Sequence, residues 1–433
     1  MTMKASQNRI GLHYFPDTLH YREADIQFWL PRLQEIGAGW LVLQATAECA
    51  IPEVFLNALT KAKIQPLIHL RLPLDPLPEP AGLRPIFDAY ARWGVRRIIL
   101  FDQPNSRSAW PSSAWAQQDL VERFLDRYLI FAQMALSAGL QPVLPPLEPG
   151  GHYWDTAFLR STLKTLQRRK QEHLLEQLGL AAYAWNNGRG LDWGAGGPER
   201  WPAAKPYQTP EGSQDQRGFR IADWYQAISQ AVLQRPLPTF LLQAGGLQAA
   251  DPTAQAESSL AIARLLHDEE VVDPQNAENL LDPLPSAVQM AAFWLLSAPD
   301  NNPHSAGAWF GEEGQPRPVA QAFREWQVVR AQADSPTLPA SKSASDHPIE
   351  HYLLLPQSEN GLSDWYLDAI RPFLRRHMPT FGFSAAEAAL ARKVTVLGDA
   401  CSDDTLVALR MAGCRVERIT GDGTTLATIL AER

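Results

Sequence analysis

Short apolar segments alternate with amphipathic segments along the first 330 residues of the chain. The amphipathic segments have helical spacing, as in residues 23–36, where Ile26, Trp29, Leu33 and Ile36 recur at intervals of three and four residues. The apolar segments have the length of buried strands, and each is followed by a helix or a long loop. The eight candidate strands are residues 9–15, 40–44, 66–70, 97–101, 141–144, 180–185, 239–243 and 288–297.

This regular repetition predicts a (β/α)8 TIM barrel over residues 1–330. Such barrels typically occupy about 250 residues before insertions, which leaves room here for long loops. No hairpin turn is recognisable between the candidate strands. A doubly wound open sheet is the main alternative, but no glycine-rich phosphate loop follows the first candidate strand. The barrel is therefore the favoured fold.

The remainder of the chain has a different pattern. Residues 331–348 are rich in Ala, Ser and Pro without periodicity, which predicts a linker. Residues 349–433 are expected to form a small α/β domain of the flavodoxin-like or Rossmann-like kind. Its candidate strands are residues 351–355, 393–397 and 415–419, with helices over 365–376 and 404–411. The single glycine after the second of these strands, Gly398, is explained by an ordinary strand-to-helix turn.

Composition and charge exclude several classes of function. The chain carries 39 Lys and Arg against 47 Asp and Glu, a formal charge of −8, so it lacks the basic surface that nucleic acids or anionic membranes require. Neither a membrane-spanning segment nor a signal sequence is recognisable, and a cytoplasmic location is expected. Three scattered cysteines predict no disulfide framework, and no clustered ligand pattern predicts a metal or another cofactor. The 14 tryptophans suit sugar-binding platforms, although a large core also accounts for them.

The residues at the carboxyl ends of the candidate strands define the predicted site, because barrel enzymes place their working groups there. The candidates are His13, Tyr14, Asp102, Gln103, Asn105, Glu148, Tyr183, Trp185, Gln243 and Trp309. The third strand adds His69 and Arg71 at its end, and the predicted cleft is aromatic, rich in amides and almost free of cations. Amides hydrogen-bond hydroxyl groups and aromatic rings stack on sugar faces. The set therefore predicts a neutral polyhydroxylated ligand rather than a phosphorylated one.

Two of these strand ends carry short motifs. The segment FDQPN at residues 101–105 resembles the Asn-Glu-Pro motif of clan A glycoside hydrolases, and LLQAGG at residues 241–246 resembles the Thr-Glu-x-Gly segment of the same clan. The resemblance covers the barrel, about three quarters of the chain. It implies that Gln103 occupies the acid/base position and Gln243 the nucleophile position. It also implies that Tyr183 occupies the place of an aromatic residue that contacts the nucleophile.

The chain departs from the clan at both catalytic positions, where glutamine replaces glutamate, and it has Asp102 where the clan has asparagine. A retaining hydrolase needs two carboxyl groups about 5–5.5 Å apart, one to protonate the leaving oxygen and one to attack carbon. An amide performs neither step. The sequence thus predicts a protein that binds a glycan without retaining hydrolysis. Two explanations for the glutamines are open: the carboxylates were lost naturally, or the chain was altered at both positions to trap its substrate. The genomic codons for these two positions distinguish the explanations.

Two further hypotheses belong to other classes. In the first, the protein is an active glycosidase that uses Asp102 or Glu148 instead. Strand alternation directs Asp102 away from the site unless the strand has already ended before it. In the second, the barrel is a scaffold and the C-terminal domain meets a protein partner that the sequence does not identify, for which Phe381 and Phe383 offer apolar contacts.

Overall fold

Eight parallel strands close into a barrel in the first part of the chain. The computed structural model describes residues 8–245, 251–334, 347–356, 370–371, 373–374, 376, 379–398 and 400–420. Around the barrel, the strands follow the order β1-β10-β7-β6-β5-β4-β3-β2. Their bounds are Ile10–His13 (β1), Trp40–Ala45 (β2), Gln65–Leu70 (β3), Arg97–Leu100 (β4), Gln141–Leu144 (β5), Gly179–Trp185 (β6), Thr239–Gly245 (β7) and Val288–Phe293 (β10). All eight candidate strands are confirmed, and so is the TIM barrel.

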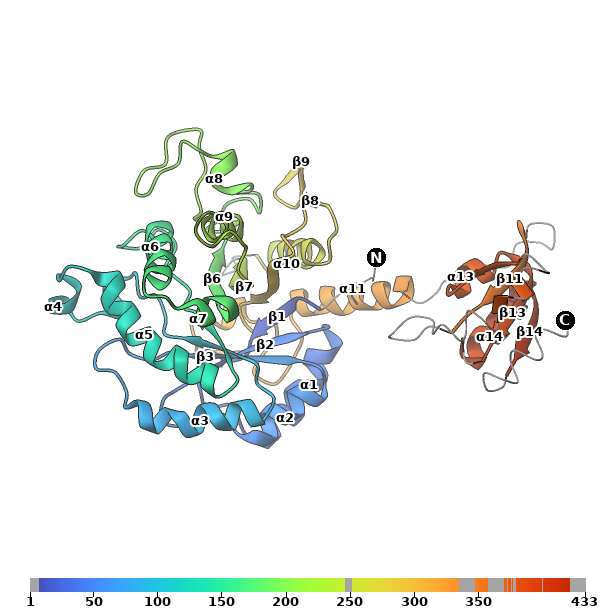
Figure 1. The fold of residues 1–433 in the computed structure, drawn as a ribbon, viewed down its shortest axis with the longest axis horizontal. Coiled ribbons are helices and arrows are strands. Elements are labelled where there is room, and N and C mark those ends of the chain that lie inside the picture. Colours follow the sequence, from blue (N-terminus) through green and yellow to red (C-terminus); the bar gives the residue numbers. More distant parts are fainter. Residues whose placement is uncertain are drawn as a thin grey trace. The chain divides into compact units, whose positions relative to one another are not determined.

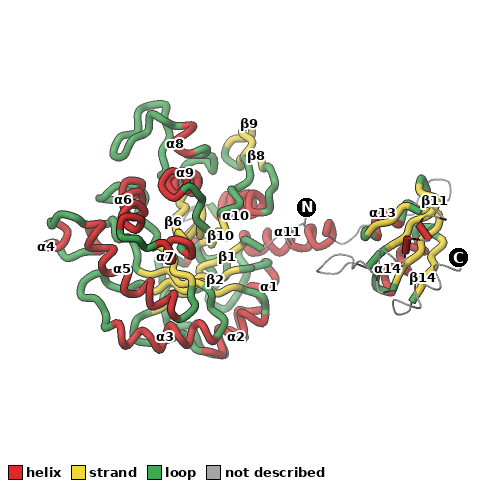
Figure 2. Tube along the Cα trace, in the orientation of Figure 1, coloured by secondary structure: helices red, strands yellow, loops and turns green. Residues whose placement is uncertain are grey.

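Helices surround these strands, as Figures 1 and 2 show. They are α1 (Glu23–Glu35), α2 (Glu53–Lys61), α3 (Pro80–Arg92), α4 (Ser112–Trp115), α5 (Leu120–Ser137), α6 (Asp155–Arg168), α7 (Glu172–Gln177), α8 (Gly197–Arg200), α9 (Ile221–Leu233), α10 (Pro252–Leu266) and α11 (Pro318–Asp334). The apolar face of each long helix packs on the strands and contributes to one continuous outer core.

Alternation along the strands divides the apolar residues into two cores. On β2, Trp40 and Val42 fill the barrel interior, whereas Leu41 and Leu43 pack outward against the helices. Successive side chains of a strand point to opposite faces, so every strand contributes to both cores. The strands are buried on both faces, and for that reason they appear in the sequence as nearly continuous apolar runs.

One pair of strands was not predicted. Strands β8 (Val271–Asp273) and β9 (Asn276–Leu281) form an antiparallel hairpin after α10, so the expectation that no hairpin occurs is wrong. The Asp273 side chain closes the turn by accepting a hydrogen bond of 2.9 Å from the Gln275 backbone N–H. An Asp that binds the backbone two residues later is a common turn device, but three strand residues are too few to give a recognisable alternation.

The C-terminal unit, residues 328–433, contains a separate parallel sheet in the order β12-β11-β13-β14. Its elements are β11 (Ile349–Leu354), β12 (Thr380–Gly382), α13 (Ala385–Ala388), β13 (Ala391–Leu397), α14 (Asp403–Met411) and β14 (Arg415–Ile419). The small α/β domain is confirmed. Strand β12 was missed because it has only three residues. Phe381 on this strand and Phe383 just after it are exposed, with exposed fractions of 53% and 48%.

Helix α11 runs past the predicted start of the linker. Helix α11 continues through Asp334, so residues 331–334 are helical and not linker. These residues are Ala-Gln-Ala-Asp, of which alanine and glutamine are good helix formers. Residues 335–346, and most of the helix predicted over 365–376, lie outside the described residues.

Candidate functional site

A connected set of polar and aromatic side chains crosses the carboxyl end of the barrel. The Asp102 carboxylate after β4 accepts a hydrogen bond of 2.8 Å from the Tyr183 hydroxyl on β6 and pairs with the Arg71 guanidinium at 3.4 Å. The ring of Tyr183 stacks on Trp185, with centroids 4.9 Å apart and planes inclined by 15°. The Trp185 indole N–H then donates to the Gln243 amide oxygen on β7 at 2.8 Å. Asp102, Tyr183, Trp185 and Gln243 are thus brought together.

The backbone after β4 explains why Asp102 points toward Tyr183. Leu100 and Phe101 both pack in the outer core, because Phe101 has a φ of +70° and breaks the alternation. A bulky residue in this region is uncommon and needs support from its surroundings. This support comes from His69, whose ring nitrogen Nε2 donates a hydrogen bond of 3.0 Å to the Phe101 carbonyl oxygen. The strand has therefore ended before Asp102, which turns into the site.

A similar irregularity presents Gln243. This residue has a φ of +50°, and the register of β7 shifts at this point relative to both neighbouring strands. A bulge of this kind re-aims a side chain next to a functional site. The backbone N–H of Gln243 donates to Nε2 of His13 at 3.2 Å. Within the described residues, the NH2 group of the Gln243 amide makes no hydrogen bond, so it is available to a ligand.

His13 and His69 are neutral in this site. Burial lowers the pKa of His13 well below its ordinary value of 6.5, and the charge that His69 would carry if protonated and the charge of Arg71 both add to the effect. Burial also lowers the pKa of His69 to about 4, with Arg71 contributing and Asp102 opposing. Since Nε2 of His13 accepts a hydrogen bond, its proton lies on Nδ1. The pKa of the Tyr183 hydroxyl is raised by burial and by Asp102, so this group stays a donor.

Gln103 follows Asp102 on the same loop and is half-buried, with a φ of +43°. Its backbone N–H donates to the Pro146 carbonyl oxygen at 3.0 Å, which ties the loop after β4 to the loop after β5. Its side chain makes no hydrogen bond to any other described residue. The amide is thus not engaged by the described residues, and its contact with a ligand stays a prediction.

Asn105 holds the two loops together instead of facing a ligand. It is fully buried, and its amide nitrogen donates to the carbonyl oxygens of Glu148 and Tyr153, both at 2.9 Å. Its amide oxygen accepts from the Glu148 backbone N–H at 2.8 Å. The expected ligand contact at Asn105 is therefore replaced by a structural one.

Glu148 itself presents a carboxylate on the loop after β5. Its oxygen Oε2 is buried and has no hydrogen-bond partner among the described residues, and it lies 4.0 Å from Nδ1 of His152. Its side chain has an exposed fraction of 35%. In the part of the chain that the structure describes, no hydrogen bond or ion pair joins the Glu148 side chain to Asp102 or Gln243.

Two predicted ligand contacts, Tyr14 and Trp309, lie in the core and are not exposed at all. Tyr14 follows His13 on β1, and alternation turns it outward, where its ring meets Phe15 and Phe55. Trp309 lies on the loop after β10, with its ring 4.5 Å from that of Phe323. The structure therefore does not bring these two side chains to the site.

Two further residues complete the site: Arg71, which was predicted at the end of the third strand without an assigned role, and Trp294, which was not predicted. Trp294 follows β10 directly, and its ring meets the His13 ring edge-on with centroids 5.1 Å apart. The apolar run of the sequence continues to residue 297, which hid the end of the strand at Phe293 and shifted the expected aromatic contact to Trp309. Arg71 lies one residue beyond the carboxyl end of β3, and residues at this position in a barrel are expected to face the site.

A cavity of about 410 Å³ lies beside Asp102, between the loops after β3 and β4. Its walls combine the apolar side chains of Leu72, Leu74 and Trp110 with the carboxylates of Asp75 and Asp102. In the described residues, no group of three or more His, Cys, Asp or Glu side chains could hold a metal ion. Nor is any helix there both long and apolar enough to cross a membrane.

Neither a protein-family model nor a curated protein matches this chain. Solved structures similar to it include a monomeric β-xylosidase from Caulobacter crescentus CB15, with 12% identity and a TM-score of 0.48 over 74% of this chain and 68% of that one. A GH128 endo-β-1,3-glucanase from Sorangium cellulosum has 15% identity and a TM-score of 0.41 over 73% and 97%. The exo-β-1,4-mannosidase Op5Man5 from Opitutaceae bacterium strain TAV5 has 11% identity and a TM-score of 0.42 over 99% and 82%.

Proposed function

We propose that the barrel binds a neutral glycan at the carboxyl ends of its strands and does not hydrolyse it by the retaining mechanism. The observation that carries this proposal is the environment of Gln243. An amide stands at the end of β7, its oxygen held by the Trp185 indole and its NH2 group unengaged within the described residues. Retaining hydrolysis needs a nucleophilic carboxylate, and an amide binds hydroxyl groups without attacking carbon.

The charges and surfaces of the site support a neutral ligand. Arg71 and Asp102 pair with each other, so their charges offset within the site. Trp185 is only partly buried, and its stacked pair with Tyr183 provides a flat aromatic surface. The free amides of Gln103 and Gln243 add donors and acceptors suited to hydroxyl groups. This combination favours a sugar over a phosphorylated compound.

The proposal is tested by incubating the protein with a panel of neutral oligosaccharides and analysing the bound material by mass spectrometry. We expect saturable binding of at least one oligosaccharide, recovered intact. Shortened oligosaccharide would contradict the absence of hydrolysis, and a panel from which nothing binds would contradict the binding function itself.

The Gln243→Ala variant tests the role of the amide in that binding. Because it removes the NH2 group offered to the ligand and the acceptor for Trp185, we expect the affinity to fall about tenfold. The Gln289→Ala variant is the matched control, since Gln289 lies near the start of β10 at the other end of the barrel. Isothermal titration calorimetry measures both, and equal affinities in the two variants would rule out the assigned role of Gln243.

An active hydrolase with a relocated carboxylate is the second candidate function. Two observations favour it: Asp102 turns into the site, and Oε2 of Glu148 is buried without a hydrogen-bond partner among the described residues. Against it, both oxygens of Asp102 already have partners in Tyr183 and Arg71, so donating a proton from Asp102 requires one of these contacts to be rearranged.

The Asp102→Asn variant separates the two functions. If the protein only binds the oligosaccharide, Asp102→Asn leaves the bound oligosaccharide intact, as the unmodified chain does. The affinity then falls only about threefold on loss of the ion pair, because the Arg71 and Asp102 side chains are both partly exposed. In a hydrolase that uses Asp102, product formation stops. Mass spectrometry of the products distinguishes these results, and the Glu148→Gln variant applies the same test to the other carboxylate.

A further inference from the structure

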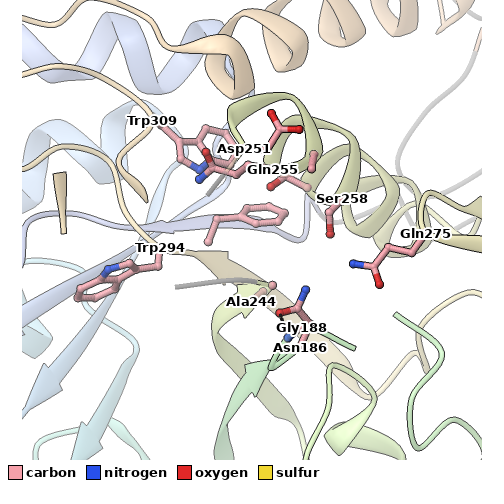
Figure 3. Close-up of a pocket in the computed structure, with 13 residues that line it drawn as sticks. Asn186, Gly188, Ala244, Asp251, Gln255, Ser258, Gln275, Trp294 and Trp309 are labelled. Atoms are coloured by element: carbon pink, nitrogen blue, oxygen red, sulfur yellow. Dashed lines mark hydrogen bonds between the residues drawn. The ribbon is translucent and has the colours of Figure 1, made fainter. Parts of the chain in front are cut away.

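A second cavity, of about 340 Å³, lies on the outer side of the barrel wall. It is bounded by the ends of β6, β7 and β10, by the first turns of α10 and by the turn of the β8–β9 hairpin. Figure 3 shows polar side chains from these separate elements around one space, among them Asn186, Gln255, Ser258 and Gln275. Segments that are distant in sequence therefore build this cavity.

The barrel wall separates this cavity from the site around Gln243. Ala244 and Phe293, which line the cavity, belong to the outer core, whereas Leu242 and Ala292 on the same strands fill the barrel interior. Figure 3 also shows the ring of Trp294 pointing away from the other labelled side chains. That ring packs against His13 on the interior side. The cavity is therefore a distinct place in the fold.

Three buried hydrogen-bonding groups of the lining residues have no partner among the described residues: the Ser258 hydroxyl and the indole N–H groups of Trp294 and Trp309. The Trp294 ring points away from the cavity, which leaves the Ser258 hydroxyl and the Trp309 N–H for a ligand. Trp309 is not exposed at all. Buried polar groups in folded proteins are almost always paired, and one left unpaired costs free energy. A ligand with oxygen acceptors would satisfy both groups.

The remaining polar groups define the charge and the donors of such a ligand. The Gln255 amide nitrogen already donates to the Gly307 carbonyl oxygen at 3.0 Å, which leaves its amide oxygen to accept a hydrogen bond. No Lys, Arg or His occurs among the described lining residues, and the one ionisable side chain there is Asp251. The lining thus offers no countercharge to an anion, and it suits a neutral molecule with several hydroxyl groups.

We propose that this cavity is a second binding site, for a neutral polyhydroxylated molecule of the size of one sugar unit. Its volume lies at the small end of the range of ligand sites, about 300–1,000 Å³, which matches a single ring rather than a chain. The described lining contains neither Gln103 nor Gln243, and Trp294, which it shares with the glycan site, turns its ring toward His13 and away from this cavity.

The test uses free glucose, mannose and xylose as probes, with binding followed by isothermal titration calorimetry. The Ala254→Trp variant fills the cavity from an exposed lining position on α10, and Glu257→Trp is its matched control, exposed on the same helix but outside the lining. We expect the cavity-filling variant to weaken monosaccharide binding by at least about tenfold and the control to leave it unchanged. The Ser258→Ala variant, which removes one donor without filling the space, is expected to weaken binding about threefold to tenfold.

Three results would overturn the second site: no probe binds, Ala254→Trp binds as well as the unmodified chain, or Trp185→Ala abolishes monosaccharide binding. The last result would place the probe inside the barrel. The glycan site is measured separately with the oligosaccharide panel. If only the proposed glycan binding is wrong, no oligosaccharide binds while monosaccharides still do. Circular dichroism of each variant checks that the barrel is folded.

Discussion

Replacing Trp185 with alanine is expected to weaken oligosaccharide binding by about 30-fold while the barrel remains folded. Trp185 contributes to the site in two ways: its indole N–H holds the Gln243 amide oxygen at 2.8 Å, and its ring extends the aromatic surface begun by Tyr183. A lost hydrogen bond and a lost stacking surface are each worth about 1 kcal/mol, and together about 2 kcal/mol corresponds to about 30-fold in affinity.

The Trp185→Phe variant separates these two contributions. It keeps a ring for stacking but has no N–H for Gln243, so we expect an intermediate loss of about fivefold. Trp93→Ala is the matched control, because Trp93 is also partly buried but caps the end of α3, far from the strand ends that carry the site. Calorimetric titration with the oligosaccharide that binds the unmodified chain gives all three affinities. An unchanged affinity in Trp185→Ala would exclude the aromatic surface as part of the binding site.

The fold was predictable because its strands are buried on both faces. Parallel barrel strands such as β2 and β3 give uninterrupted apolar runs, and amphipathic helices separate them, so the eightfold repetition is visible in the sequence. Short elements lack this signal. Strands β8 and β12 have three residues each, too few to distinguish an alternation of apolar and polar residues from chance.

The site was predictable only where the strands are regular up to their ends. His13, Tyr183 and Trp185 follow the alternation of β1 and β6 and face the interior as a regular strand requires. The same alternation, applied to Tyr14, would have assigned it to the outer core. By contrast, the orientation of Asp102 depends on Phe101, a non-glycine residue at a φ of +70°. Nothing in the local sequence indicates such a conformation, which tertiary contacts with His69 and the outer core support.

The same buried histidines predict how the stability of the barrel depends on pH. In the folded protein, the pKa of His69 is about 4, below its ordinary value of 6.5, and that of His13 is also well below 6.5. The unfolded chain therefore binds protons more readily than the folded one as the pH falls below 6.5. The contribution to stability is fully present above pH 6.5, and for His69 it is lost progressively down to pH 4.

We expect the free energy of unfolding to be about 2 kcal/mol lower at pH 5 than at pH 7 through His69, and His13 acts in the same direction. Urea denaturation followed by tryptophan fluorescence measures it, because 13 of the 14 tryptophans lie in the barrel unit, residues 1–327. The His69→Asn variant keeps a donor for the Phe101 carbonyl but does not titrate, so its stability should change less between pH 7 and pH 5. The His173→Gln variant on the exposed face of α7 should retain the full change.

Protonation of His13 has a consequence for binding as well as for folding. Its Nε2 accepts the backbone N–H of Gln243, and the imidazolium would place a second donor opposite that N–H, beside the charge of Arg71. Oligosaccharide affinity should therefore stay constant from pH 7 down to pH 6 and fall as the barrel loses stability at lower pH.

The urea denaturation gives the deciding result for the stability prediction. If the free energy of unfolding falls by the same amount between pH 7 and pH 5 in His69→Asn and in the unmodified chain, the buried histidines do not control the acid sensitivity of the barrel.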